Sequence, residues 1–173
     1  MITRRNQRRN GRQRGGVVLE AALVLPAMLL LLWGVVSFGA IFYTQIAVTR
    51  AAEDGAMAAN MLRPNFSETG EIAAEDQTRI KDEIVNSLAA SLVAPPAHNE
   101  SIDSRRAWLV NVRDDIQLDS NGDCDGTPCL RIRVVFPYDS GSDTRILPSI
   151  TIPLIGQMSW LPENLVGEAS ILL

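Results

Sequence analysis

One apolar run limits how this chain can fold. From Val17 to Tyr43 every residue is apolar or small, apart from Glu20 and Ser37. The hydrocarbon core of a bilayer is ~30 Å thick, and about 20 apolar residues cross it as an α-helix. The run therefore predicts a single membrane-spanning helix, and the remaining polar chain must fold outside the bilayer.

The charges on either side of this run predict its orientation. The first fifteen residues contain six arginines and no acidic residue, whereas the whole chain has a net charge of -4, so the remainder carries -10. Basic flanks stay on the cytoplasmic side of a membrane. We therefore expect a single-pass protein with a cytoplasmic N-terminus and an acidic domain on the other side of the membrane. Nucleic acid is excluded as a partner of that domain, because binding it requires cations that neutralise phosphates.

The start of the run does not fit a general secretory signal, whose apolar region is shorter and lacks a carboxylate. Instead, Gly15 and Gly16 stand before the run, and Glu20 is the fifth residue after Gly15. This arrangement resembles the processing site of type IV prepilins, which are cut after a glycine so that glutamate becomes the fifth mature residue. The resemblance implies that a prepilin peptidase cuts between Gly15 and Gly16.

Glu20 is costly where it stands, because a charged side chain inside the apolar region costs at least about 2.5 kcal/mol. A cut before Gly16 would create a positive amine four residues away. The prepilin resemblance implies that Glu20 pairs with the new N-terminus of a neighbouring subunit. The alternative is that Glu20 lies at the headgroup boundary without a specific partner.

The helix is predicted to continue beyond the membrane, from about Gly16 to Asn60. The segment from Thr44 to Met61 lacks proline and is rich in alanine, the best helix former. Pro64 should end the helix, and Pro26 should loosen it locally. Small residues let helices approach closely, so we expect lateral packing on the faces that carry Ala and Gly.

The segment from Leu19 to Ala59 resembles the TadE-like family. The resemblance rests on the Glu20–Pro26 opening, on Ser37-Phe38-Gly39 and on the Ala-Ala-x-x-Gly-Ala pattern of Ala51–Ala56. Family members are pilin-like proteins of the tight-adherence (Flp, type IVb) pilus system. The resemblance implies a minor pilin or pseudopilin of the bacterial inner membrane, with its C-terminal domain in the periplasm. Its partners would be other pilin-like subunits and the pilus assembly machinery.

The rest of the chain predicts an α+β domain. An amphipathic helix is expected over 71–92, because Ile80, Ile84 and Leu88 recur every four residues. Alternating apolar and polar residues predict strands, with an edge strand over 150–155 and a closing strand over 167–173. The other expected strands are 108–113, 115–118 and 130–137. We divide the chain into a leader (1–15), a long helix (16–63) and a periplasmic domain (64–173).

Two cysteines, Cys124 and Cys129, lie in this domain with four residues between them. In an oxidising periplasm they should form a disulfide. The turn-forming residues before and between them predict that the pair caps a hairpin whose connection covers 119–126. A metal or redox role for the pair is weaker, because the spacing is not Cys-x-x-Cys and His98 is distant in sequence.

The same connection offers one alternative, a weak calcium loop. Cys124 stands where an EF-hand needs glycine, so turn chemistry explains these residues better. The candidate ligands are Asp119, Asn121, Asp123 and Asp125.

No motif for catalysis or for a cofactor is present, since the lone His98 has no nucleophile motif near it and no phosphate-binding glycine loop occurs. We therefore expect a protein of assembly and not an enzyme. The alternative is an uncleaved single-pass membrane protein whose periplasmic domain binds a partner in a secretion or pilus machine.

Overall fold

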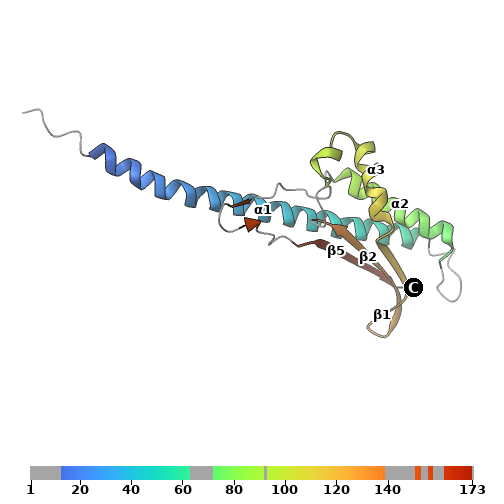
Figure 1. The fold of residues 1–173 in the computed structure, drawn as a ribbon. Coiled ribbons are helices and arrows are strands. Elements are labelled where there is room, and N and C mark those ends of the chain that lie inside the picture. Colours follow the sequence, from blue (N-terminus) through green and yellow to red (C-terminus); the bar gives the residue numbers. More distant parts are fainter. Residues whose placement is uncertain are drawn as a thin grey trace, which may run out of the picture. The chain divides into compact units, whose positions relative to one another are not determined.

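The computed structural model describes residues 13–62, 72–91, 93–138, 151–152, 156–157 and 162–172 (Figure 1). The chain divides into two units, residues 1–40 and 41–173, which are described separately. Helix α1 (Gln13–Leu62) is 50 residues long and contributes to both. The sequence-based boundaries at 15/16 and 63/64 stay predictions.

The first unit contains the apolar half of α1. Gly16–Leu62 meets the length and composition of a membrane span, with a mean hydropathy of 2.3 in its most apolar window, only 6% of which is buried. At 1.5 Å per residue these 47 residues extend ~70 Å, more than twice the ~30 Å of a hydrocarbon core. The prediction of one long helix, longer than a membrane span requires, is therefore confirmed. Pro26 lies inside α1 and does not end it.

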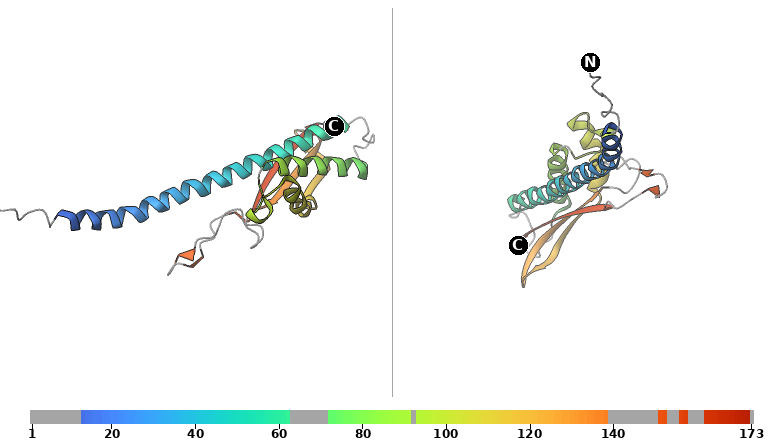
Figure 2. Two further views of the ribbon diagram at one scale, coloured as in Figure 1. Left: turned by 90° about the horizontal axis from the view of Figure 1, so that it is seen from above. Right: turned by 90° about the vertical axis from the view of Figure 1, so that its left-hand side faces the viewer.

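The second unit combines the end of α1 with two further helices and a three-stranded antiparallel sheet, which confirms the predicted α+β class (Figure 2). The sheet has the order β1-β2-β5, so β2 is central. A separate pair of short strands is formed by β3 and β4. The elements are α2 (Ala74–Ala90), the 3-10 helix η2 (Pro96–His98), α3 (Ile102–Arg113), β1 (Ile116–Cys124), β2 (Thr127–Pro137), β3 (Thr151–Ile152), β4 (Gly156–Gln157) and β5 (Asn164–Leu172).

One face of the sheet and one face of α2 form the core. The inward side chains of β2 are fully buried, as are those of α2 at four-residue spacing. This spacing is the amphipathic pattern that predicted α2, and the alternation in β2 is the pattern that predicted that strand. Both predictions are confirmed. The core residues concerned are Leu130, Ile132, Val134 and Phe136 in β2 and Ile80, Ile84 and Leu88 in α2.

The prediction of a strand over 108–113 is wrong, because these residues belong to α3. The side chain of Ser101 accepts a hydrogen bond from the backbone N–H of Ser104, which caps the helix. The buried side chains Arg105, Leu109 and Val112 recur at helical spacing. Positions 108, 110 and 112 are all apolar, and this short alternation is typical of a strand. The N-cap at Ser101 and the helical spacing of the buried side chains are visible only over the longer segment 101–113.

The hairpin was placed correctly, but its connection is shorter than predicted. Strands β1 and β2 continue to a two-residue turn, Asp125–Gly126, whose residues both have positive φ (55° and 82°). This is the geometry of a primed hairpin turn, for which Asp-Gly is favoured. An extra residue in β1 between Asp119 and Gly122 shifts the register there.

The two C-terminal strand predictions have different outcomes. The closing strand is confirmed as β5, which begins three residues earlier than expected and pairs with β2. The edge strand is present only as β3, over Thr151–Ile152. The remainder of that prediction, Ile150 and residues 153–155, lies outside the described residues.

Candidate assembly surface

The predicted processing site lies at the beginning of α1. Gly15, Gly16 and Glu20 are all helical, and the side chain of Glu20 is exposed. A Cβ placed on Gly16 would meet no atom within 4 Å. Positions four residues apart are neighbours on a helix, so an amine created at Gly16 would lie one turn from Glu20. The structure is compatible with a pairing inside one chain as well as with a neighbour.

Outside the predicted span, one face of α1 is covered by the protein's own domain. Val48, Ala51, Ala52 and Ala59 have no exposed surface. Next to them, a Cβ on Gly55 would lie 2.5 Å from Cγ1 of Ile84, which shows how closely α2 approaches.

This burial corrects one expectation from the sequence. Between residues 47 and 59 the Ala- and Gly-bearing face of α1 is not available to a neighbouring subunit, because its own core occupies it. The sequence could not distinguish packing within a chain from packing between chains, since small residues serve both.

The opposite face of α1 is exposed and largely apolar. Ile46, Met57 and Met61 are 68%, 63% and 82% exposed, although they lie beyond the most apolar part of the helix. Arg50 and Glu53 lie between them on the same face. We call this surface the outer α1 face; it consists of Phe42, Ile46, Arg50, Glu53, Met57 and Met61.

A shallow hollow of 480 Å³ lies along this face. Its lining residues come from successive turns of α1 and include Ile46, Arg50 and Met57. Sequence reasoning missed the outer α1 face, although the helical spacing of its apolar residues is a visible signal.

Three hydrogen bonds fix the rotation of α1 within the second unit. The Tyr43 hydroxyl donates to the carbonyl of Ser91 at 2.8 Å. The Gln45 Nε2 donates to the carbonyl of Val166 at 2.8 Å. The hydroxyl of Ser87 donates to Asp54 Oδ2 at 2.5 Å. The outer α1 face is therefore held in one orientation on its domain.

The predicted disulfide between Cys124 and Cys129 is present, with 5.8 Å between the Cα atoms. It closes the end of the hairpin next to the Asp125–Gly126 turn.

Two of the four candidate calcium ligands bind backbone N–H groups instead. Asp119 Oδ1 accepts from Asn121 N at 3.0 Å, and Asp123 Oδ1 accepts from Gly126 N at 2.7 Å. In the described part of the chain, no group of three or more His, Cys, Asp or Glu residues could hold a metal ion. These contacts are those of carboxylates that stabilise a turn.

His98 lies in η2 and stacks on Trp108 of α3, with 6.5 Å between the ring centroids. Trp108 in turn makes an edge contact with Phe136 of β2. The histidine thus belongs to an aromatic cluster at the edge of the core, in line with a structural role.

Comparison with protein families gives one match. The family model described as "TadE-like protein" matches residues 15–57, a quarter of the chain. This segment contains Gly15, Gly16, Glu20 and most of the outer α1 face. Neither the curated proteins nor the solved structures contain a significant match.

Proposed function

Because residues 15–57 form a TadE-like segment, which associates the chain with tight-adherence pilus systems, we propose that the protein is a minor pilin or pseudopilin of such a pilus. A prepilin peptidase cuts it between Gly15 and Gly16, and its long helix then packs with other pilin-like subunits. The apolar part of α1 anchors it as a single-pass protein of the inner membrane, with the second unit in the periplasm. Its task is assembly and not catalysis.

The outer α1 face is the observation that carries this proposal. An apolar helix face outside a membrane is covered in most stable proteins, and exposed apolar patches mark sites of interaction. Here the domain covers only one side of the helix, and Ile46, Met57 and Met61 remain exposed on the other. A neighbouring helix is a suitable partner for such a narrow surface, because apolar anchors one and three turns apart on one face fit into the grooves of another helix.

Glu20 supplies the register of this packing. In a medium of low dielectric constant, a carboxylate is strongly attracted to an amine and strongly penalised without one. When Glu20 pairs with the amine of a neighbouring chain, and not with the amine of its own chain one turn away, the pair selects one stagger of neighbouring helices.

The outer α1 face is tested by placing a charge on it. Ile46→Asp and Met57→Asp should leave the protein folded and in the membrane, because both side chains are exposed, but should reduce the number of pili per cell. Electron microscopy of a deletion strain that carries each variant measures this. Ile102→Asp is the matched control, since Ile102 is an exposed apolar residue of α3, 44% exposed. Normal piliation with both α1 variants would refute a role of this face.

The role of Glu20 is tested by Glu20→Ala and Glu20→Gln. Both should insert into the membrane, since removal of the charge favours insertion, and both should abolish piliation because they cannot pair with an amine. Pili of normal number in the Glu20→Ala strain would count against the pairing.

The alternative is an uncleaved membrane protein whose second unit binds a partner in the same machine. It predicts that the chain keeps Met1, whereas the proposal predicts a mature chain that begins at Gly16. The two functions are thus distinguished by the N-terminus of the protein isolated from cells.

A further inference from the structure

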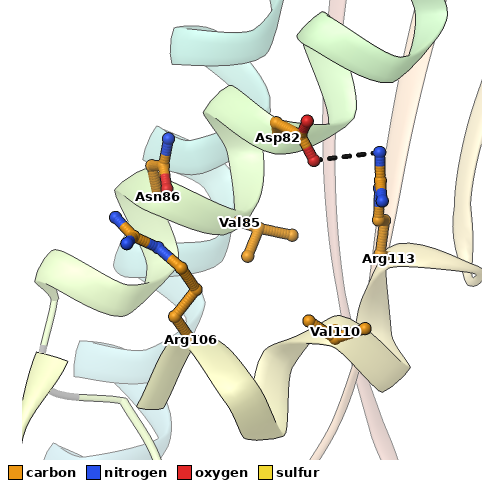
Figure 3. Close-up of a pocket in the computed structure, with 6 residues that line it drawn as sticks. All are labelled: Asp82, Val85, Asn86, Arg106, Val110 and Arg113. Atoms are coloured by element: carbon orange, nitrogen blue, oxygen red, sulfur yellow. Dashed lines mark ion pairs between the residues drawn. The ribbon is translucent and has the colours of Figure 1, made fainter. Parts of the chain in front are cut away.

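A second surface lies between α2 and α3, away from the outer α1 face. It is a hollow of 370 Å³, lined by Val85 and Val110 together with four polar residues (Figure 3). Arg106 and Asn86 lie at one end of this hollow, and the Asp82–Arg113 ion pair lies at the other. An adjoining hollow of 360 Å³ shares Arg113 and includes Lys81. We call the two together the α2–α3 groove.

The lining of this groove has one more cation than carboxylates, on a domain that is acidic overall. Three cations line it, Lys81, Arg106 and Arg113, against two carboxylates, Asp82 and Asp114. Arg113 is bonded to Asp82 at 3.0 Å, and Arg106 lies 3.8 Å from Asp103.

Of these three cations, Lys81 is the one that makes no ion pair within the described part of the chain. Val110 adds an apolar contact, since it is 52% exposed. The groove therefore suits a ligand with one or two carboxylates and a small apolar group.

The tip of the β1–β2 hairpin, residues 120–130, carries such carboxylates and an apolar group. Residues 120–130 contain Asp123 and Asp125 and no Lys or Arg. Pro128 is exposed and is paired with Asp123 across the hairpin.

The tip is also rigid. The Cys124–Cys129 disulfide and the Asp125–Gly126 turn hold it in one conformation. A ligand that is already rigid loses little conformational entropy when it binds.

The tip cannot reach the groove of its own chain. Strand β1 begins three residues after Arg113 and continues for nine residues, which at about 3.3 Å each places the tip nearly 30 Å away. Figures 1 and 2 show the tip at the end of the sheet remote from α3. The occupant must then come from a second chain.

We propose that the hairpin tip of one copy binds in the α2–α3 groove of the next copy. Asp123 and Asp125 face Lys81 and Arg106, and Pro128 packs on Val110. Because the two surfaces differ, the contact is head-to-tail and can be repeated from copy to copy without closing into a dimer. This inference adds a named contact to the proposed assembly but does not depend on processing at Gly15.

The contact can be detected with a zero-length carbodiimide cross-linker, which joins an amine to a carboxylate. Lys81 is the only lysine of the chain, so its cross-links are unambiguous. Full-length protein labelled with ¹⁵N is mixed with unlabelled protein in detergent micelles, treated and digested. We expect peptides in which Lys81 of one isotope is joined to Asp123 or Asp125 of the other. Links of Lys81 only within one chain, only to other carboxylates, or none at all would overturn the proposal.

Paired variants test the head-to-tail geometry. Asp123→Asn with Asp125→Asn removes the charge of the tip but keeps turn-forming residues. Lys81→Glu with Arg106→Glu reverses the charge of the groove at one half-buried and one exposed position. Each double variant alone should self-associate about tenfold more weakly in sedimentation measurements, as expected for two exposed charge pairs of up to about 1 kcal/mol each.

A mixture of the two double variants should form heterodimers and nothing larger, because it contains one intact tip and one intact groove. Arg79→Glu is the control on α2 outside the groove and should associate like the unmodified chain. Equal association of all variants would overturn the contact, while the piliation tests of the outer α1 face would be unaffected.

Discussion

At the scale of single residues, two glycines determine how closely α1 can lie to its domain. A Cβ on Gly167 would lie 2.6 Å from the backbone oxygen of Val48, and one on Gly55 would lie 2.5 Å from the side chain of Ile84. A side chain can change its rotamer, but a helix carbonyl cannot move without its backbone. The two distances are similar, but the structure should tolerate an added methyl group better at Gly55 than at Gly167.

We therefore expect Gly167→Ala to destabilise the second unit by about 3 kcal/mol and Gly55→Ala by about 1 kcal/mol, the range found for overpacked cores. Gly34→Ala is the control, because a methyl group at that position would meet no atom within 4 Å. Denaturant unfolding of the full chain in detergent, followed by circular dichroism, measures the three variants. A cost for Gly55→Ala as large as that for Gly167→Ala would contradict this difference between side chain and backbone.

A second residue, Arg105, is 8% exposed and joins two helices. Its Nε donates to the carbonyl of Ala89 at 2.7 Å, and its Nη1 donates to Asn99 Oδ1 at 3.2 Å. It thus bonds the C-terminal end of α2 to the first turn of α3, where a cation also interacts favourably with the helix dipole of α2.

Arg105→Met should reduce the free energy of unfolding by about 2 kcal/mol, because it leaves a buried carbonyl without a donor. Arg105→Lys should cost less, since it keeps the charge, but it should not be neutral because lysine lacks the planar fork. The same unfolding measurement compares them. Equal stability of Arg105→Met and the unmodified protein would show that these bonds contribute nothing.

At the scale of elements, the hairpin tip is stabilised twice, by the disulfide and by the turn. The disulfide closes a loop with a sequence separation of only 5. The tip lies at the edge of the hydrophobic core cluster, which contains Leu130 and Ile132. Of the two cysteines, Cys129 is fully buried beside that cluster and Cys124 is only half-buried. Loss of the disulfide should therefore loosen the tip and leave the core folded.

Cys124→Ser with Cys129→Ser should cost about 2 kcal/mol, the loop-closure value for so short a loop. Amide hydrogen exchange should accelerate at Asn121–Thr127 and remain slow at Leu130–Phe136. Fast exchange throughout β2 would contradict the independence of tip and core. Because the tip is the proposed ligand of the α2–α3 groove, this variant should also lose the Lys81 cross-link.

The elements also show what sequence could predict. Helix α1 could be predicted from the length of its apolar run and its alanine-rich continuation, and helix α2 and strand β2 each from one strong periodicity. Helix α3 was mistaken for a strand because Trp108, Val110 and Val112 alternate locally, while the deciding N-cap, Ser101, lies seven residues before the first of them.

The two proposed surfaces could not be predicted in the same way. The outer α1 face is defined by what the domain leaves uncovered, and the α2–α3 groove combines Lys81 with Arg106 from another helix. Both depend on tertiary packing, which periodicity within one segment does not contain. Gly15, Gly16 and Glu20, in contrast, form a linear motif, so their roles could be proposed from the sequence alone and stay predictions.

At the scale of the whole molecule, the two parts of helix α1 differ in which side chains they expose. Its first part has exposed apolar side chains on all sides, as a lipid-facing or subunit-facing helix requires. Its last part has one buried face and one exposed face. In the proposed function, the chain is held by a membrane before assembly and by other helices afterwards, and removal of the basic leader with its six arginines comes between the two.

The N-terminus of the mature protein tests this account most directly. The chain is expressed with an active prepilin peptidase, isolated from membranes and analysed by intact mass and N-terminal sequencing, with Gly15→Leu as the variant that should resist cleavage. The account predicts a chain that begins at Gly16 and lacks the first fifteen residues. A chain that still begins at Met1, in cells where the peptidase cuts another prepilin, would contradict it.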